Sequence, residues 1–528
     1  MKNSLFTLLF ILLLPVIAKA QNEGLKYINR NDLVSYMKFL ASDQMKGRET
    51  GSPQNDLAAL YLETNAMRLG LKPVPGSDGF LQKVAFVSRS VEKGSSNITA
   101  RDENGNLITS SDSIVSLVPL SVSTEAKGEV VFAGYGYEDK QSGYSDLKDI
   151  DITDKIVMIM TRNPEAAADP KFASGYIFDE KIEVSKLMPL FSKRPKAVLV
   201  VYDPKNKFHD VYTSGLAEML GGNNSVSLKG NAGMSIPVRI FFITGYTADK
   251  ILSKSGMTLK QYQDKIDTEK KPLSGPLTGV NVSFSAKVTE KEFTAYNVVG
   301  MVEGSDPVLK NECVVYSAHF DHTGVNEQGE AFNGADDNAS GSIGLLGVAD
   351  AFSHLKKKPL RSVVFVWANA EEKGLLGSMY YVNHPLVSMD KTILDINVDM
   401  IGRSITPSDT GKFMGYNLDV TGKDEVIMYN YEKSSELVKL AKDDAAKTGV
   451  KILLKGKTMP FGGSDHQSFS MKKVPWIMFH SGIHSDLHSV RDDAEKVDYE
   501  KMEKVSKLMF LIGYQVANQK GRITEDTK

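Results

Sequence analysis

The chain has 528 residues, more than one ordinary hydrophobic core accommodates, and we expect two or three domains. Its 63 basic and 65 acidic residues nearly cancel to a net charge of −2, which argues against binding to nucleic acid or an anionic membrane. Cys313 is the only cysteine, so an intramolecular disulfide is excluded and stability must come from the cores or from bound metal.

The first twenty residues, MKNSLFTLLFILLLPVIAKA, have the pattern of a secretory signal peptide. A lysine precedes an apolar run, and Ala18-Lys19-Ala20 forms a cleavage site that would leave Gln21 as the N-terminus. A membrane anchor is the alternative, although the apolar run is short for a span. No later segment is long and apolar enough to cross a bilayer, so we expect an exported protein without stable membrane insertion.

The sequence also contains Asn-x-Ser/Thr triplets, which accept N-linked glycans in eukaryotic secreted proteins. One triplet begins at Asn338, inside a cluster of acidic residues, where a glycan would obstruct the chemistry. This favours a bacterial periplasmic or secreted protein over a eukaryotic glycoprotein. The four triplets begin at Asn97, Asn223, Asn281 and Asn338.

Residues 31–71 look helical, whereas residues 117–280 have a different texture. They contain the short apolar runs GEVVFAGYGY, DKIVMIM, KAVLVVYD and IPVRIFFI, separated by polar connections with glycine, which predicts a mostly-β domain. Only His209 of the nine histidines falls in this block, and no acidic pair follows one of its strands. We therefore expect this domain to lack catalytic groups of its own.

From residue 296 onward, apolar strands alternate with helices. CVVYSAH, SVVFVWANA, TILDINVDM and VPWIMFH predict strands, while SGSIGLLGVADAF, residues 424–448 and residues 499–516 predict helices. Nearly continuous apolar strands between helices indicate an α/β fold with a mostly parallel central sheet covered by helices on both faces.

The segment FNGADDNASG places Asp336 and Asp337 among small residues just before the first of these helices. Turn and cap roles explain many such pairs, so the neighbouring segments have to decide the matter. In parallel sheets, functional groups gather beyond the carboxyl ends of the strands. Histidine and acidic residues follow the predicted strands at this edge: His319, Asp321, Glu371, Glu372, Asp399, His484, His488 and Asp492.

Imidazole and carboxylate are ligands that suit zinc. Two histidines and three carboxylates could hold two ions that share one carboxylate, about 3.5–4 Å apart. Asp321 and Asp492 could accept hydrogen bonds from the far ring nitrogens of the liganding histidines. One of the two adjacent glutamates can ligate while the other stays free as a base, although a helix N-terminus would also explain the pair. Four other histidines are interpreted as ordinary polar residues: His322, His354, His384 and His480.

Six segments of the chain resemble the M28 family of dizinc exopeptidases. The resemblance covers residues 31–115 and about 296–513, and the β block between is similar to the protease-associated domain that is commonly inserted in such enzymes. The β block carries this second likeness in VVFAGYG, DKIVMI and AVLVVYD. The six segments are HFD at His319, GADDNASG at Gly334, AEEKGLLGS at Ala370, VDM at Val398, GGSDHQSF at Gly462 and HSVRD at His488.

The resemblance implies a zinc exopeptidase fold in residues 21–116 and 281–528, interrupted by an inserted domain in residues 117–280. It also implies two zinc ions: Asp337 bridges them, His319 and Asp399 complete one site, and Glu372 and His488 complete the other. Glu371 would be the general base. Some family members have a tyrosine three residues before the Ser-Asp-His motif that stabilises the oxyanion. Phe461 stands there instead, which leaves His466 or the metals for that role.

The implied activity is that of an aminopeptidase that acts on peptides. A glutaminyl-peptide cyclase on the same scaffold is one alternative, and a peptide-binding protein with a decayed site is another. The second alternative is disfavoured because every ligand position and the base are present in the sequence. The side-chain preference, the choice between the two ends of a peptide and the oligomeric state do not follow from the sequence.

Overall fold

The computed structural model describes residues 23–92, 94–117, 120, 122–164, 180–206, 208, 210–213, 217, 224–230, 238–413, 416–431, 434–456, 463–523 and 526. The expected signal peptide in residues 1–20 and the positions of His209, Asn223 and Phe461 lie outside the described residues. The chain divides into two compact units. The first comprises Met1–Ala85, Thr294–Phe413 and Asn417–Lys528, and the second comprises Phe86–Phe293 with Met414–Tyr416.

The first unit is built around a mixed sheet with the strand order β10-β1-β13-β15-β14-β16-β21-β19-β20. Its four central strands are parallel to one another, and every residue in them is buried. They are β15 (Ser362–Ala368), β14 (Cys313–His319), β16 (Thr392–Val398) and β21 (Trp476–His480). The outer strands are β1 (Leu81–Val91), β13 (Val288–Val302), β19 (Glu425–Asn430) and β20 (Lys451–Leu454), with β10 (Asn224–Leu228) paired to the part of β1 that belongs to the second unit.

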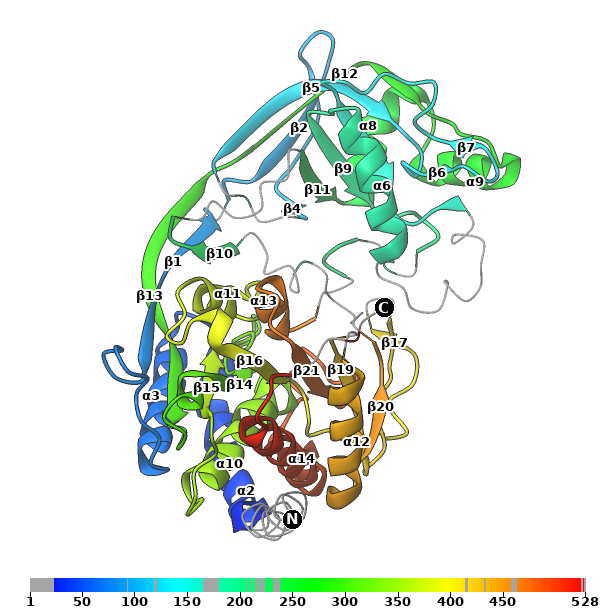
Figure 1. Cartoon of the computed structure of the whole chain (residues 1–528). Helices are drawn as coiled ribbons and strands as arrows, with labels where there is room; N and C mark the ends of the chain where they lie inside the picture. The colour runs from blue at the N-terminus through cyan, green and yellow to red at the C-terminus, as the bar shows by residue number, and fades with distance from the viewer. Residues whose placement is uncertain are drawn as a thin grey trace. The chain divides into compact units, whose positions relative to one another are not determined.

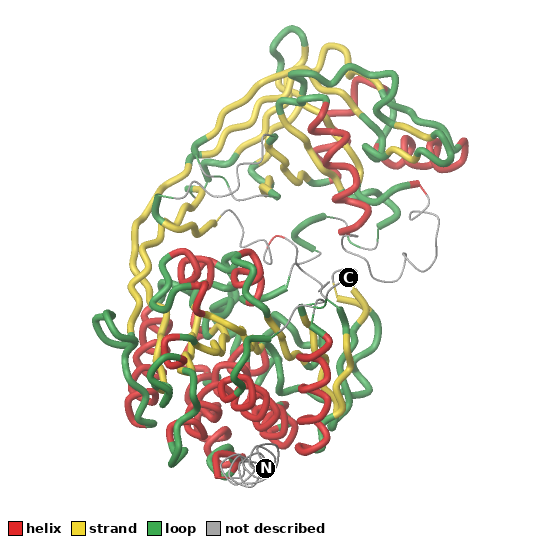
Figure 2. The backbone as a smooth tube through the Cα atoms, viewed as in Figure 1, coloured by secondary structure: helices red, strands yellow, loops and turns green. Residues whose placement is uncertain are grey.

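Helices cover both faces of this sheet, as Figures 1 and 2 show. Along β14, Val314 and Tyr316 pack into one core while Val315 packs into the other, because successive side chains of a strand point to opposite faces. The first face carries α2 (Arg30–Leu40), α3 (Pro53–Arg68), α10 (Gly341–Ser353), α12 (Ser435–Thr448) and α14 (Tyr499–Asn518). The second face carries α11 (Leu376–Asn383) and α13 (His466–Met471).

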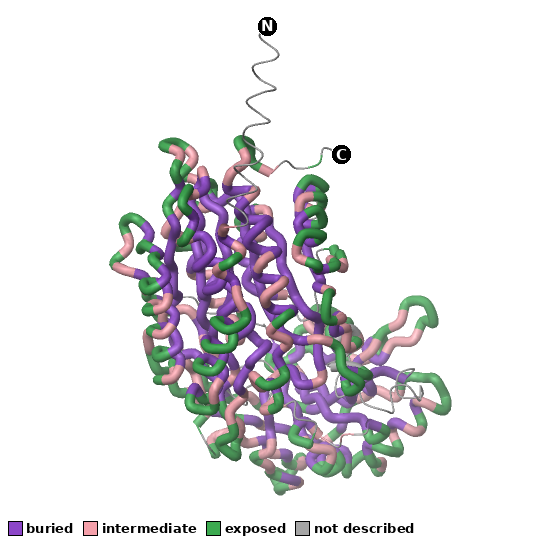
Figure 3. The backbone as a smooth tube through the Cα atoms, turned by 90° about the horizontal axis from the view of Figure 1, so that it is seen from below, coloured by how far each residue is buried: buried purple, intermediate pink, exposed green. Residues whose placement is uncertain are grey.

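The expected α/β fold with a mostly parallel central sheet is therefore confirmed. One expected helix is partly wrong, because residues 425–430 form the buried strand β19, antiparallel to β21, and the helix begins only at Ser435. Figure 3 shows buried residues concentrated in the strands and in the helices packed on them. Among the described residues, no helix combines the length and the apolar character that a membrane crossing requires.

The second unit has its own sheet, with the order β3-β2-β12-β5-β8-β9-β11-β4. It extends beyond the expected insert of residues 117–280, because residues 97–102 pair with residues 280–285 and therefore fold with it. Strands β5, β8, β9 and β11 are parallel neighbours. The strands are β2 (Asn97–Asp102), β3 (Leu107–Ser111), β4 (Ile114–Ser116), β5 (Thr124–Phe132), β8 (Ile156–Met160), β9 (Ala197–Val201), β11 (Arg239–Ile243) and β12 (Gly275–Ala286), and the helices are α6 (Glu180–Ser192), α8 (Gly245–Leu252) and α9 (Leu259–Glu269).

Candidate metal centre

The metal-type residues predicted from the sequence meet at the carboxyl edge of the central sheet. His319 ends β14, Asp399 follows β16 directly, and Glu371 and Glu372 lie in the turn after β15. Asp337 lies in η4 (Ala335–Ser340), immediately before α10. The carboxyl ends of parallel strands share one edge, so segments far apart in the sequence converge there. The fifth predicted ligand, His488, reaches the same place from the loop after β21.

Asp337 lies between two groups of side chains. Its Oδ1 is 3.4 Å from Nε2 of His319, and its Oδ2 is 3.1 Å from Nε2 of His488. His319 Nε2 is also 3.4 Å from Oδ1 of Asp399, while His488 Nε2 is 3.3 Å from Oε2 of Glu372. The two oxygens of one carboxylate thus face two separate sets of possible metal ligands.

The ligand atoms of the first group are unusual for a protein interior. Nε2 of His319 and Oδ1 of Asp399 are buried and have no hydrogen-bond partner. Burying polar atoms without a partner is costly, and metal coordination is one way to satisfy them. Burial alone would lower the pKa of His319, but Asp399 and Glu371 raise it well above the ordinary value. The carboxylates of this group and its unpartnered imidazole nitrogen and carboxylate oxygen suit a bound zinc ion.

Glu371 also lies within reach of the first group, because its carboxylate clusters with His319 and Asp399. Its Oε2 is 3.9 Å from Nε2 of His319, at the outer limit of an ion pair. Burial raises the pKa of Glu371 well above its ordinary value, with His319 acting against this shift and the neighbouring Glu372 adding to it. Glu372, in contrast, has a pKa well below its ordinary value, because His488 and His322 overcome the effect of burial. The two adjacent glutamates therefore differ in environment.

Comparison with known proteins agrees with this geometry. Residues 297–512 match the model of Peptidase family M28. The chain carries a peptidase family M28 domain. Among curated relatives, leucine aminopeptidase 2 of Trichophyton rubrum is 32% identical over 189 residues, which are 34% of this chain and 32% of that protein. The match thus spans about a third of that relative's length.

Two solved structures resemble nearly the whole chain. An aminopeptidase from Aneurinibacillus sp. strain AM-1 superposes with a TM-score of 0.58 at 18% identity, covering 96% of this chain and 98% of that one. BSAP, a zinc aminopeptidase from Bacillus subtilis, has a TM-score of 0.53 at 17% identity and covers 95% and 98%. At such identities, these likenesses establish the fold of the chain and nothing further.

Asp321 and Asp492 support the candidate metal centre through contacts other than those expected. Nδ1 of His319 lies 3.2 Å from the backbone oxygen of Asp321 and 3.9 Å from its carboxylate. That carboxylate instead accepts from the backbone nitrogens of Glu371 at 3.0 Å and Glu372 at 3.3 Å. Asp492 likewise accepts from the backbone nitrogen of Asp337. Both aspartates orient the backbone that carries the candidate ligands.

Asp336 does not share the role of its neighbour Asp337. Its Oδ1 accepts from the backbone nitrogen of Gly402 at 2.6 Å, and its Oδ2 is 3.5 Å from Nε2 of His484. Of the two carboxylates in the GADDN segment, Asp337 faces the candidate metal centre, whereas Asp336 is held by Gly402 and His484 away from it. Arg403 lies beside this contact and donates to Asp486 at 2.8 Å.

The structure adds one residue that the sequence analysis set aside. His322 is fully buried, and its Nδ1 is 2.7 Å from Oε1 of Glu372 and 3.7 Å from Oδ2 of Asp337. In the sequence, only the position of His322 three residues after His319 hints that it lies at the candidate metal centre. His466, the expected oxyanion or substrate contact, is buried with its ring 4.3 Å from that of Trp476, and burial lowers its pKa to about 3.

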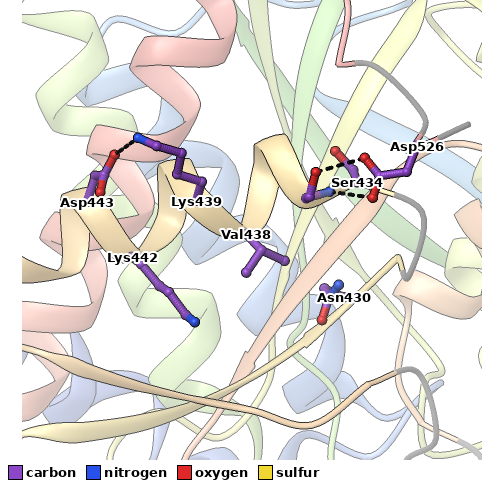
Figure 4. A pocket seen from close by; sticks show the side chains of 8 residues that line it. Asn430, Ser434, Val438, Lys439, Lys442, Asp443 and Asp526 are labelled. Carbon is purple, nitrogen blue, oxygen red and sulfur yellow. Dashed lines mark hydrogen bonds and ion pairs between the residues drawn. The ribbon is translucent and has the colours of Figure 1, made fainter.

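The first unit also has a pocket of about 450 Å³ at the start of α12 (Figure 4). Both of its carboxylates are engaged: Asp526 accepts from the backbone nitrogen and hydroxyl of Ser435, and Asp443 pairs with Lys439 at 2.6 Å. The residues that line it include no histidine, and none of them belongs to the candidate metal centre. We therefore assign the chemistry to the sheet edge and not to this pocket.

Proposed function

We propose that the protein is a dizinc aminopeptidase that removes the N-terminal residue of peptides. The observation that carries the proposal is the position of Asp337, whose two oxygens face His319 and His488 separately. The M28 domain and the aminopeptidase relatives support the same reaction class. The cyclase alternative uses a single zinc, and the division of the ligands into two groups favours the peptidase.

Each zinc ion would have its own set of ligands in addition to the shared Asp337. His319 and Asp399 would hold one ion, and Glu372 and His488 would hold the other. When bound, the two ions supply Lewis-acid polarisation of the scissile carbonyl and lower the pKa of the attacking water. The close approach of the ligand atoms on both sides of Asp337 is compatible with this arrangement.

Glu371 is the proposed general base. It would accept a proton from the attacking water and deliver it to the nitrogen of the leaving peptide. The carbonyl carbon thus gains the hydroxide of the water, and the released amine gains its proton. Its raised pKa suits a group that both takes and returns a proton during the reaction. His466 is the proposed contact for the carbonyl oxygen, and its lowered pKa of about 3 would keep it neutral with one ring N–H to donate.

Export completes the proposal. The sequence of residues 1–20 has the pattern of a cleavable signal peptide, and peptides in the periplasm or outside the cell would then be the substrates.

A panel of peptides tests the function in the presence of zinc. Peptides with a free N-terminus should be cleaved one residue at a time, including those with a blocked C-terminus, whereas N-blocked peptides should resist. Cleavage from the C-terminus would contradict the proposal. Ammonia released from N-terminal glutaminyl peptides without loss of a residue would instead identify a cyclase.

A further inference from the structure

His322 touches each of the segments that supply the ligands of the ion held with His488. Its ring lies at 5.5 Å from the ring of His488 in an edge-on arrangement. A Cβ on Gly334, in the GADDN segment, would lie 2.5 Å from Cδ2 of His322, so only glycine permits this approach. The third contact is the 2.7 Å distance from Nδ1 to Glu372 Oε1.

The distances between side-chain atoms distinguish the proposed metal ligand His488 from the hydrogen-bond donor His322. Two atoms bound tetrahedrally to one zinc, each about 2.0–2.1 Å away, lie about 3.3 Å apart. His488 Nε2 lies at 3.1 Å from Asp337 Oδ2 and 3.3 Å from Glu372 Oε2, as expected for a shared ion. The 2.7 Å distance from His322 Nδ1 to Glu372 Oε1 is too short for two atoms bound to the same zinc ion and fits a charge-assisted hydrogen bond. This contact uses Oε1 of Glu372, whereas His488 faces Oε2.

We propose that His322 is a positioning residue that donates from Nδ1 to Oε1 of Glu372 and thereby leaves Oε2 for the zinc ion held with His488. The inference rests on the proposed dizinc function. Glu372 would then bind its ion through one oxygen only, because the second oxygen is held by the imidazole. A neighbour that orients a metal ligand in this way typically contributes about 10–100-fold to metal affinity.

Two substitutions distinguish a donor from a ligand. His322→Phe keeps an aromatic ring between Gly334 and His488 but removes the donor. His322→Asn places an amide N–H near the position of Nδ1, so it can donate to Glu372, but an amide nitrogen does not bind zinc. The exposed His384, which stacks on Tyr380 with ring centroids 4.3 Å apart, provides the control His384→Phe.

The measurement is the affinity of each zinc ion in the full-length chain, obtained by competition with a chelator. We expect His322→Phe to weaken one ion by about 10–100-fold and to leave the other unchanged, while His322→Asn and the control stay near wild type. Equal loss in His322→Asn and His322→Phe would make His322 a direct ligand and overturn the inference.

If His322→Phe kept both ions at wild-type affinity, this inference would be overturned while the proposed function would stand. A wild-type chain that binds no zinc would overturn the proposed function and this inference with it. Thermal unfolding of the metal-free variants shows whether each one is folded, so a loss of zinc cannot be mistaken for a loss of structure.

Discussion

The carboxylate of Asp492 holds Asp337 by its backbone: Oδ2 of Asp492 lies 3.1 Å from the nitrogen of Asp337. The same oxygen accepts from the nitrogen of Asp336 at 3.0 Å, and the other oxygen lies 3.4 Å from Nη1 of Arg403. The backbone of the proposed bridging residue is therefore fixed by a group four positions after His488. One buried carboxylate links two of the loops that form the candidate metal centre.

Asp492→Ala should lower zinc affinity by about tenfold or more, because Asp337 would lose the hydrogen bond that fixes its backbone. Asp492→Asn keeps one oxygen acceptor and should fall between the alanine variant and wild type. Zinc retained after dialysis against a weak chelator measures the effect. The adjacent Asp493 accepts from Asn333 at 2.8 Å, so Asp493→Asn is the matched control. An equal loss of zinc in that control would point to general loosening of the loop.

Part of this arrangement can be predicted from the sequence. The central strands are recognisable because they are apolar throughout. Most candidate ligands are recognisable because they follow such a strand, whereas Asp337 is recognisable from the acidic pair just before α10. The contacts of Asp492 and His322 are not recognisable, since they are made with backbone atoms and side chains distant in sequence. The sequence predicts a helix at residues 425–430 because no local signal shows that β21 pairs with them.

The division of the chain leads to a second prediction. Replacing residues 86–293 with a short glycine-containing turn should preserve zinc binding, because every residue of the two ligand groups lies in the first unit. The cut ends fall within β1 and β13, which are neighbours in the sheet and can be joined as a hairpin. Zinc per chain and circular dichroism measure the outcome.

Removing only residues 117–280 provides the contrast. This deletion removes β5, β8, β9, β11 and the first half of β12. Only β2, β3, β4 and the rest of β12 would remain of the second unit's sheet, and the edge of β12 that pairs with β5 would be exposed. We expect that shorter deletion to aggregate. Loss of zinc from a folded chain lacking residues 86–293 would show that the second unit contributes to the metal centre.

Metal removal should destabilise the first unit more than the second. A ligand present at 100 times its dissociation constant stabilises the folded state by about 2.7 kcal/mol per site, and both proposed sites lie in the first unit. Hydrogen exchange with and without a strong chelator should show lost protection around residues 319–322, 335–340 and 484–492. Equal loss of protection across the 86–293 sheet would contradict this location.

A buried carboxylate in the second unit predicts a dependence of stability on pH. Burial raises the pKa of Asp146 to about 6, despite hydrogen bonds from the Tyr144 hydroxyl and the backbone nitrogens of Tyr137 and Tyr135. Between about pH 4 and 6 the folded chain therefore binds more protons at this residue than the unfolded chain does. Its contribution to the free energy of unfolding falls as pH rises through this range, by on the order of 3 kcal/mol.

Asp146→Asn should remove this part of the pH dependence, because the amide does not titrate. Urea unfolding of both proteins at pH 4, 5, 6 and 7 isolates the contribution, since all other groups are common to the pair. An unchanged difference in stability between pH 4 and 7 would show that Asp146 titrates normally in the folded protein.

The adjacent glutamates provide the sharpest test of the proposed mechanism. Glu371→Gln should keep both zinc ions and the fold but lower turnover by about 10²–10⁴-fold, because the amide cannot accept a proton from the attacking water. Glu372→Gln should instead lower the zinc content, because Oε2 of Glu372 lies 3.3 Å from Nε2 of His488 and a neutral amide is a poor zinc ligand. Zinc content and turnover, measured for both variants under the same conditions, separate the two roles. If Glu371→Gln lost zinc while Glu372→Gln retained it, the roles would be reversed, and unchanged turnover in both would exclude this sheet edge as the active site.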